Sequence, residues 1–368
     1  MSTVEHVSTA ELAERSRAII RDLQTAEGAY PASPDFSAYR GYCWMRDGAF
    51  IADAASAAGD IESAERFYEW CTAITVRYSE DFEIAIAAAS SGAPLGDERM
   101  MPARFTFDGS RGTDDWWDFQ LDGYGTWLWA LGEHVRRHGV TVDPYAEAMD
   151  ITARYLASSW DRPCYDWWEE NRDHVHVSTL GCIGAGLESA LALGHLSETT
   201  AATATVAATA IRATVDADAA RHGHLVKWIG SDDVDASLAA LISPLGYIAA
   251  ADPVARATVL AIEDALVVDH GVHRYAKDTF YGGGQWPLLS CFLGLAHGAL
   301  GDDAEARAYL AWAASTVRGD GAMPEQVPNH LLAASRRDEW VERWGTVATP
   351  LVWSHAMLLR LQMELSKP

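Results

Sequence analysis

The chain is short of positive charge and of long apolar runs, and each absence excludes a class of partner. Its 368 residues include 28 Lys and Arg against 52 Asp and Glu, which gives a formal net charge of −24. A surface of this sign repels nucleic acid and acidic lipid, so we expect neither as a partner. Even the Ala-rich stretch at residues 85–93 is too short to span a membrane, and it contains Ser and Gly.

Cysteine is also scarce. The five cysteines are odd in number and include no Cys-x-x-Cys pair, which favours reduced thiols in the cytoplasm over a disulfide framework or a structural zinc site. Residues 1–7 have neither the basic nor the apolar region of a signal peptide, so we expect a cytoplasmic protein. His174 and His176 lack a third ligand at suitable spacing, and we expect no metal.

Strand patterns are weak, and helical periodicity dominates instead. Only residues 105–108 and 223–228 could form short hairpin pieces, and no alternation of strands with helices predicts a parallel sheet. Apolar residues recur at helical spacing in about twelve segments, one of which has Asp60 as its predicted N-cap. These segments are residues 9–24, 48–58, 61–78, 124–138, 144–159, 178–193, 197–215, 235–241, 253–266, 286–300, 303–317 and 349–364.

The number of these helices and their arrangement in consecutive pairs predict an all-α fold in which helical hairpins close into a ring. An open helical solenoid is the alternative, although it should show a clearer sequence repeat. No Pro-rich, Ser-rich or charged linker divides the chain, so we expect one domain over residues 1–368. Five polar and aromatic segments fall mostly between the helices, where loops at one rim could form a site: residues 39–47, 114–122, 164–176, 273–286 and 324–329.

The most unusual segment is residues 165–170, Tyr-Asp-Trp-Trp-Glu-Glu, which places three carboxylates among three aromatic rings. Apolar rings beside an acid raise the pKa of one carboxyl while a neighbour stays charged. Pairs of such acids cleave glycosidic bonds, and indole faces pack against sugar rings. Taken alone, the segment fits equally well a buried turn whose acids cap a helix or pair with arginines.

Six short segments together resemble glycoside hydrolase family 15, the glucoamylase-type inverting glucosidases. Each segment alone is weak, but the six recur in the family's order. The resemblance implies an (α/α)6 toroid of six helical hairpins with few short strands in its loops, in agreement with the helix count, and a reaction without a cofactor. The segments are residues 42–48 (Tyr-Cys-Trp-Met-Arg-Asp-Gly), 120–125 (Gln-Leu-Asp-Gly-Tyr-Gly), 165–170, 274–278 (Arg-Tyr-Ala-Lys-Asp), 324–326 (Pro-Glu-Gln) and 353–356 (Trp-Ser-His-Ala).

The resemblance also implies roles for individual residues. Glu169 matches the general acid and Glu325 the general base that activates water, and inverting enzymes hold two such carboxyls about 6.5–9.5 Å apart. Glu170 would point away from the acid and bind substrate hydroxyls in the +1 subsite. Arg46 and Asp47 would clamp hydroxyls of the non-reducing glucose, although they also fit a structural ion pair at a helix start.

Other residues are expected to surround the sugar. Trp44 and Trp116 resemble wall residues, Asp122 and Asp166 resemble hydrogen-bonding acids around the site, and Arg274 resembles the family arginine at the sugar. The remaining members of the predicted substrate-binding set are Trp168, which would pack against the acid, Phe280 and Trp286.

One position departs from the family pattern in a way that bears on the reaction. Phe280 stands where many members have a tyrosine whose hydroxyl would reach towards the base and a second tyrosine, here Tyr39. The missing phenol would leave Tyr39 less restrained and able to share the base role with Glu325, which we treat as a hypothesis. The same Phe resembles a bacterial subgroup that acts on isomaltose. We expect neither a starch-binding module nor an N-terminal β-sandwich beside the predicted toroid.

The resemblance implies an inverting exo-α-glucosidase that releases β-glucose from isomaltose or short isomalto-oligosaccharides. Glucoamylase-like α-1,4 activity and trehalase activity stay open within the same reaction class. A sugar epimerase or a non-catalytic sugar-binding ring is the alternative from another class. An epimerase would typically use histidines as acid and base, and a binding module would not need both Glu169 and Glu325.

Overall fold

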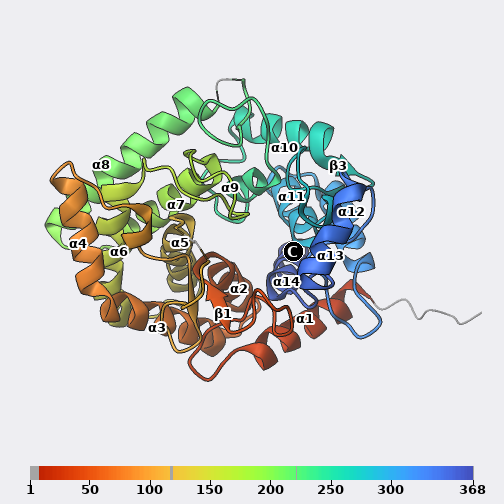
Figure 1. Ribbon diagram of the computed structural model, residues 1–368, viewed down its shortest axis with the longest axis horizontal. Coiled ribbons are helices and arrows are strands. Elements are labelled where there is room, and N and C mark those ends of the chain that lie inside the picture. Colours follow the sequence, from red (N-terminus) through yellow and green to blue (C-terminus); the bar gives the residue numbers. More distant parts are fainter. Residues whose placement is uncertain (1–7, 117–118, 221, 368) are drawn as a thin grey trace, which may run out of the picture.

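The computed structural model describes residues 8–116, 119–220 and 222–367. Twelve of the fourteen α-helices of these residues form two concentric rings, and short strands lie in the connecting loops (Figure 1). None of the described helices is long and apolar enough to cross a membrane. Residues 1–7, on which the prediction of a missing signal peptide rests, lie outside the described residues.

Six helices surround the centre of the molecule, and each contacts the next around a closed circle (Figure 1). The circle closes because the last helix contacts the first, so the predicted ring is confirmed and an open solenoid is excluded. The inner helices are α2 (Met45–Ala57), α5 (Asp122–His138), α7 (Val177–Leu193), α9 (Ala239–Ile242), α11 (Pro287–Ala299) and α14 (Val352–Leu365).

Six outer helices alternate with the inner ones along the chain, which gives the six hairpins of an (α/α)6 toroid. They are α1 (Thr9–Leu23), α3 (Ile61–Arg77), α6 (Ala146–Ser159), α8 (Glu198–Thr214), α10 (Pro253–Leu266) and α12 (Asp303–Ser315). Two further helices, α4 (Ser79–Ser90) and α13 (Arg337–Trp344), stand outside this alternation. The sequence patterns did not predict either of them.

Glycines let neighbouring inner helices approach closely. A Cβ atom on Gly125 of α5 would lie 2.3 Å from the carbonyl oxygen of Cys182, and one on Gly186 of α7 would lie 2.3 Å from that of Gly125. No side chain fits at either position, because real Cβ atoms do not come that close to a carbonyl oxygen. This close packing of α5 on α7 fixes the spacing of the loops that precede both helices.

The strands are short, and their pairing holds together loops that lie near the starts of the inner helices. β1 (Tyr42–Trp44) pairs antiparallel with β2 (Arg104–Thr106), in a register that sets Trp44 opposite Arg104. β1 leads directly into α2, so this pairing fixes the indole of Trp44 at the entrance to the ring. The other pair is β3 (Val267–Val268) with β4 (Gly271–Val272).

One local prediction was wrong, and another was right only in position. Residues 223–228 do not form a strand, because they make only an isolated bridge between Trp228 and His176. Asp60 is the N-cap residue of α3, as predicted, but its side chain makes no capping hydrogen bond. Its carboxylate instead accepts two hydrogen bonds from Arg17 of α1, at 2.7 and 2.8 Å, which joins two outer helices.

Candidate active site

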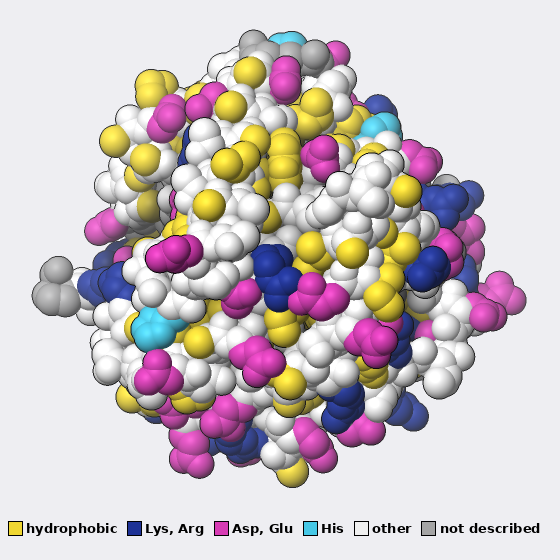
Figure 2. Space-filling model, turned by 90° about the vertical axis from the view of Figure 1, so that its left-hand side faces the viewer, with side chains coloured by type: hydrophobic (Ala, Val, Ile, Leu, Met, Phe, Trp, Pro, Cys, Tyr) yellow, Lys and Arg dark blue, Asp and Glu magenta, His cyan; other side chains and the backbone are white. Residues whose placement is uncertain are grey.

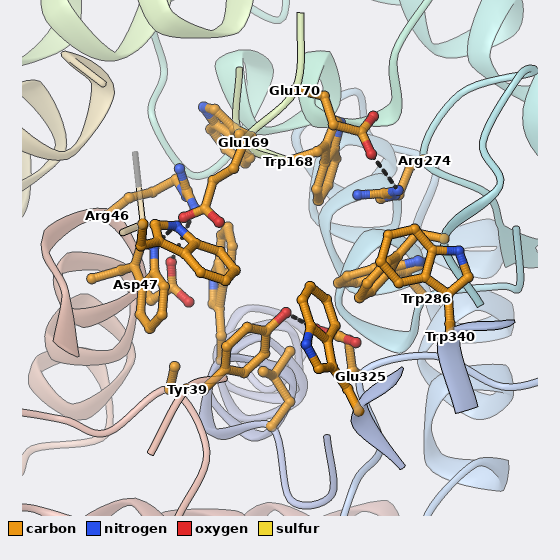
Figure 3. A pocket seen from close by; sticks show the side chains of 18 residues that line it. Tyr39, Arg46, Asp47, Trp168, Glu169, Glu170, Arg274, Trp286, Glu325 and Trp340 are labelled. Atoms are coloured by element: carbon orange, nitrogen blue, oxygen red, sulfur yellow. Dashed lines mark hydrogen bonds and ion pairs between the residues drawn. The ribbon is translucent and has the colours of Figure 1, made fainter. Parts of the chain in front are cut away.

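A pocket of about 190 Å³ opens at the end of the ring where the inner helices begin (Figure 3). Two lining residues, Trp167 and Trp353, pack on the buried ring of Phe50, which stacks on Trp353 at 5.5 Å and lies 5.6 Å from Trp167. All but two of the predicted site residues line the pocket, which brings together segments far apart in the sequence: Tyr39, Trp44, Arg46, Asp47, Trp116, Trp168, Glu169, Glu170, Arg274, Phe280, Trp286 and Glu325.

The predicted general acid sits in a tight turn organised by a buried carboxylate. Asp166 accepts hydrogen bonds through Oδ1 from the backbone amides of Trp168 at 3.0 Å and Glu170 at 2.9 Å. Glu169 adopts φ 61°, a left-handed conformation that costs energy for a residue with a side chain. Its Oε1 accepts a hydrogen bond from the indole Nε1 of Trp44, so the acid is held from the opposite wall as well.

The predicted base is buried and meets one hydrogen-bond donor. Glu325 is 1% exposed, and its Oε1 accepts a hydrogen bond of 2.8 Å from the hydroxyl of Tyr39. Burial raises the pKa of Glu325 to about 8, against the opposing effects of the Tyr39 hydrogen bond and the positive charge of Arg274. Burial and the neighbouring Glu325 raise the pKa of Tyr39 well above its usual value, so this phenol stays protonated.

Arg46 and Asp47 form an ion pair at the start of α2, and both also line the pocket. The guanidinium of Arg46 donates to Gln120 Oε1 at 2.6 Å and to Asp122 Oδ2 at 3.0 Å, and it lies over the rings of Trp353 and Trp167. Burial raises the pKa of Asp47 to about 6, although Arg46 opposes this shift. The pair is therefore structural and also positioned to hold a ligand.

The sequence profile of glycosyl hydrolases family 15 matches residues 16–317. The chain belongs to glycoside hydrolase family 15. Isomaltose glucohydrolase of Kribbella flavida is 51% identical over 96% of this chain and 92% of its own length. A solved structure described as a wild-type glycosidase has 49% identity and a TM-score of 0.95, with 99% of each chain covered.

More distant structures share the fold of this glycoside hydrolase. A bacterial glucoamylase complexed with acarbose has 20% identity and a TM-score of 0.75, over 96% of this chain and 55% of that one. Trehalase 2 of Sulfolobus acidocaldarius is 25% identical over 64% of this chain and 43% of its own length. The bacterial glucoamylase therefore shares the helical toroid of this chain, and the trehalase is similar to it in sequence.

Glu170 points away from Glu169, as predicted, and is held on the other side of the pocket (Figure 3). Arg274 lies 3.3 Å from its Oε1, and the hydroxyl of Tyr275 donates to its Oε2. Arg274 is itself fixed by two hydrogen bonds to Asp278, of 2.8 and 2.5 Å. Tyr275 was not predicted as a site residue, and its position directly after the family arginine is the only sequence signal for it.

The two predicted site residues that do not line the pocket are Asp122 and Asp166. Both are buried, and their carboxylates bond to Arg46 and to the Glu169 turn. Their predicted contact with substrate is therefore revised to support of the residues that line the pocket. The reason is that each carboxylate is already occupied by the charged or amide groups behind the wall.

Sequence reasoning missed much of the aromatic wall. The overlooked lining residues that matter most are Trp340 and Trp344, which α13 brings to the mouth of the pocket. Trp344 lies 6.1 Å from Trp116, ring centre to ring centre, and 6.3 Å from Phe280. The other overlooked residues are Ala32, Trp167, Leu351 and Trp353.

Proposed function

We propose that this family 15 enzyme is an inverting exo-α-glucosidase that releases β-glucose from isomaltose or short isomalto-oligosaccharides. The observation that carries the proposal is the convergence of Glu169 and Glu325 on one aromatic pocket from two different loops. Kribbella flavida isomaltose glucohydrolase, at 51% identity, supports the choice of substrate. A neutral sugar also suits a pocket that contains both signs of charge.

In this mechanism Glu169 donates a proton to the departing glycosidic oxygen. The indole of Trp44 donates a hydrogen bond to Oε1 of Glu169 and holds the carboxyl from the opposite wall of the pocket. The fixed turn around Asp166 aims the carboxyl into the pocket and limits its rotation. Glu169 is thus the acid that makes the leaving group neutral.

Glu325 accepts a proton from the attacking water on the opposite face of the sugar. Its Oε1 is occupied by Tyr39, whereas its buried Oε2 has no hydrogen-bond partner among the described residues. Oε2 is therefore the atom that takes the proton when water lies directly against Glu325. Tyr39, which stays protonated, shares the base role as a relay: its oxygen takes a proton from water while its own proton passes to Oε1 of Glu325. Phe280 has no hydroxyl with which to restrain this phenol.

Arg46, Asp47 and Arg274 hold the non-reducing glucose, because charged groups fixed by buried partners can bond its hydroxyls without rearranging. Glu170 binds the second sugar in the +1 subsite from the side of Arg274. The rings of Trp44, Trp116, Trp168 and Trp286 form the walls. No step needs a cofactor.

The rival functions differ in what they require of the pocket. Among the described residues that line it there is no histidine, so nothing supports the acid and base of an epimerase. A sugar-binding ring would not need Glu169 and Glu325 together. α-1,4-Glucosidase and trehalase activities use the same two carboxyls, and only the substrate separates them from the proposed activity.

The deciding experiment measures glucose release from isomaltose, maltose and trehalose side by side, with the anomer followed by NMR. We expect β-glucose first, and fastest from isomaltose. β-Glucose mainly from maltose or trehalose would keep the mechanism and change the substrate. If the folded protein releases glucose from none of the three, the substrate is a longer or different oligosaccharide or the function lies outside the hydrolases. If either Glu169→Gln or Glu325→Gln turns over at the wild-type rate, the proposed catalytic pair is wrong.

We also propose that residues 1–368 form a single catalytic domain and that the protein works in the cytoplasm. The closed ring, which uses helices from α1 to α14, supports the first point. The five cysteines are all buried and unpaired, as suits a reducing compartment. The partner of this enzyme is a small oligosaccharide, and we expect it to bind neither nucleic acid nor a membrane.

A further inference from the structure

One buried lysine lies behind the wall that carries Glu169. The chain has only three lysines, and two of them, Lys277 and Lys367, are exposed and paired with surface acids. The third, Lys227, is 3% exposed. Burying an ammonium group is costly unless carboxylates compensate it, and a methionine of similar volume would fill the same space without that cost. The charge at this position therefore calls for an explanation.

The ammonium of Lys227 joins two buried carboxylates. Its Nζ lies 2.5 Å from Oδ2 of Asp235 and 3.3 Å from Oδ2 of Asp166. Burial alone would lower the pKa of Lys227, but Asp235 and Asp166 outweigh burial and raise it. The lysine is thus charged, and its charge holds two acids together that would otherwise repel.

Each contact of Lys227 leads to a residue beside Glu169. Asp166 bonds the backbone amides of Trp168 and Glu170, which flank the acid on both sides. Asp235 accepts a hydrogen bond of 2.9 Å from the indole Nε1 of Trp168 through the same oxygen that contacts Lys227.

A third contact reaches the next residue of the turn. The Nζ of Lys227 lies 3.8 Å from the ring centre of Tyr275, and the hydroxyl of Tyr275 donates to Glu170. Lys227 thus contacts three supporting residues. Asp166 holds the backbone of the turn, Asp235 holds the indole of Trp168, and Tyr275 holds the carboxylate of Glu170.

We propose that Lys227 is a positioning residue that fixes the turn carrying Glu169, and that it acts through Asp166, Asp235 and Tyr275. The inference rests on the proposed function, in which Glu169 is the general acid. Glu169 has a left-handed backbone, which persists only where its surroundings enforce it. Without the lysine charge, Asp166 and Asp235 repel each other, the turn relaxes and the acid loses its alignment with the leaving oxygen.

The test compares two substrates that differ in their need for the acid, and KM on isomaltose reports separately on the hold of Glu170 on the second sugar. Isomaltose requires a protonated leaving group, whereas α-glucosyl fluoride loses fluoride without full protonation. For Lys227→Met we expect kcat on isomaltose to fall about 100-fold with KM changed less than about threefold, because misplacement by about 1 Å has effects of that size. On α-glucosyl fluoride we expect less than about a tenfold loss.

Two controls make the result specific. Lys277→Met removes an exposed lysine and should leave both activities unchanged. Glu169→Gln should lose isomaltose activity and keep much of its fluoride activity; if it keeps both, the proposed function has failed, independently of Lys227.

Equal loss on both substrates in Lys227→Met, or no loss on either, would overturn the positioning role. If Lys227→Met does not fold, Lys227→Gln, which keeps amide donors and loses the charge, is measured in the same way. Failure of both variants to fold would assign Lys227 to the stability of the ring and would also overturn the proposal.

Discussion

At the scale of one residue, the burial of Glu325 makes stability and activity depend on pH in opposite ways, because activity requires the ionised carboxyl and stability favours the protonated one. The carboxyl is 1% exposed, and burial raises its pKa from the usual 4.5 to about 8. The folded state therefore binds this proton more tightly than the unfolded state does. The contribution of Glu325 to stability is most favourable below pH 4.5 and is lost as the pH rises through about 8.

Glu325→Gln should separate these two properties. We expect kcat to fall by about 10²–10⁴-fold, because the base is lost. At pH 9 the variant should gain about 1–3 kcal/mol in the free energy of unfolding, since no buried carboxylate has to ionise. The gain should disappear below pH 4.5, the usual pKa of glutamate. Urea unfolding at the two pH values measures it, and an equal gain at both would contradict the role of ionisation.

The hydroxyl of Tyr39 should set where activity appears on the pH scale. Glu325 must be ionised to act as a base, so the acid limb of kcat/KM should lie well above pH 4.5. Tyr39→Phe removes the hydrogen bond that lowers the pKa of Glu325, and this limb should move to higher pH while kcat falls at least about tenfold.

The shared base role of Tyr39 also predicts the shape of the profiles of kcat/KM against pH. The wild-type profile should depart from a simple two-group bell, and Phe280→Tyr should bring it nearer to one, because the added phenol would restrain Tyr39. A simple bell in both proteins would rule out shared base catalysis.

At the scale of elements, the sequence predicted the helices that have a clear apolar stripe. The limits of α3 and α12 were predicted within two residues, because their buried residues recur at helical spacing. α13 was missed because its eight residues include none that is buried, so no apolar period exists. Trp340 and Trp344 were missed for the same reason, because both lie on α13. Lys227 was missed because only folding brings it beside the Glu169 turn.

The helix α13 should limit the length of substrate that the pocket accepts. Its Trp344 contacts Phe36 and Trp116 at ring distances of 6.1 Å and narrows the mouth. We expect Trp344→Ala to raise kcat/KM for isomaltotriose relative to isomaltose about 10-fold, an effect typical of small changes in pocket volume. Glu342→Ala on the exposed side of the same helix is the control. An unchanged ratio in Trp344→Ala would mean that another element limits chain length.

At the scale of the whole molecule, charge is arranged differently outside and inside. The net charge is −24, and on the face shown in Figure 2 acidic side chains are dispersed among basic and apolar ones. Inside the ring, buried Asp53 of α2 pairs with Arg137 of α5 and with Arg360 of α14, the latter at 3.0 Å. One carboxylate thus joins the first, second and last inner helices. The position of Asp53 between these three helices, like the position of Lys227 beside the Glu169 turn, could not be predicted from local sequence patterns.

Asp53→Ala should destabilise the ring without changing its chemistry. Burial opposes ionisation of Asp53, but Arg137 and Arg360 outweigh it and hold the pKa of that carboxyl below 3.8. Its stabilisation is therefore present above pH 3.8 and lost as the pH falls through the lower, folded value. We expect a loss of about 3–5 kcal/mol at pH 7, because two arginines lose their counter-charge.

Thermal unfolding measures that loss, with Asp60→Ala as the matched control. Asp60 pairs with Arg17 between outer helices and is partly exposed, so its loss should cost about 1 kcal/mol or less. The kcat of Asp53→Ala at 25 °C should match wild type, since Asp53 does not line the pocket. Equal destabilisation by the two variants would contradict a special role for the inner pair.

Closure of the inner ring by α14 also has a consequence for synthesis of the chain. The pocket takes residues from Ala32 to Trp353, and α14, which packs on α1 and α2, is the last of the ring helices to leave the ribosome. Until then, the apolar sides of α2 and α11 that α14 covers have no partner. The nascent chain therefore carries an open, inactive arc of helices, and catalytic competence appears only after α14 has been made.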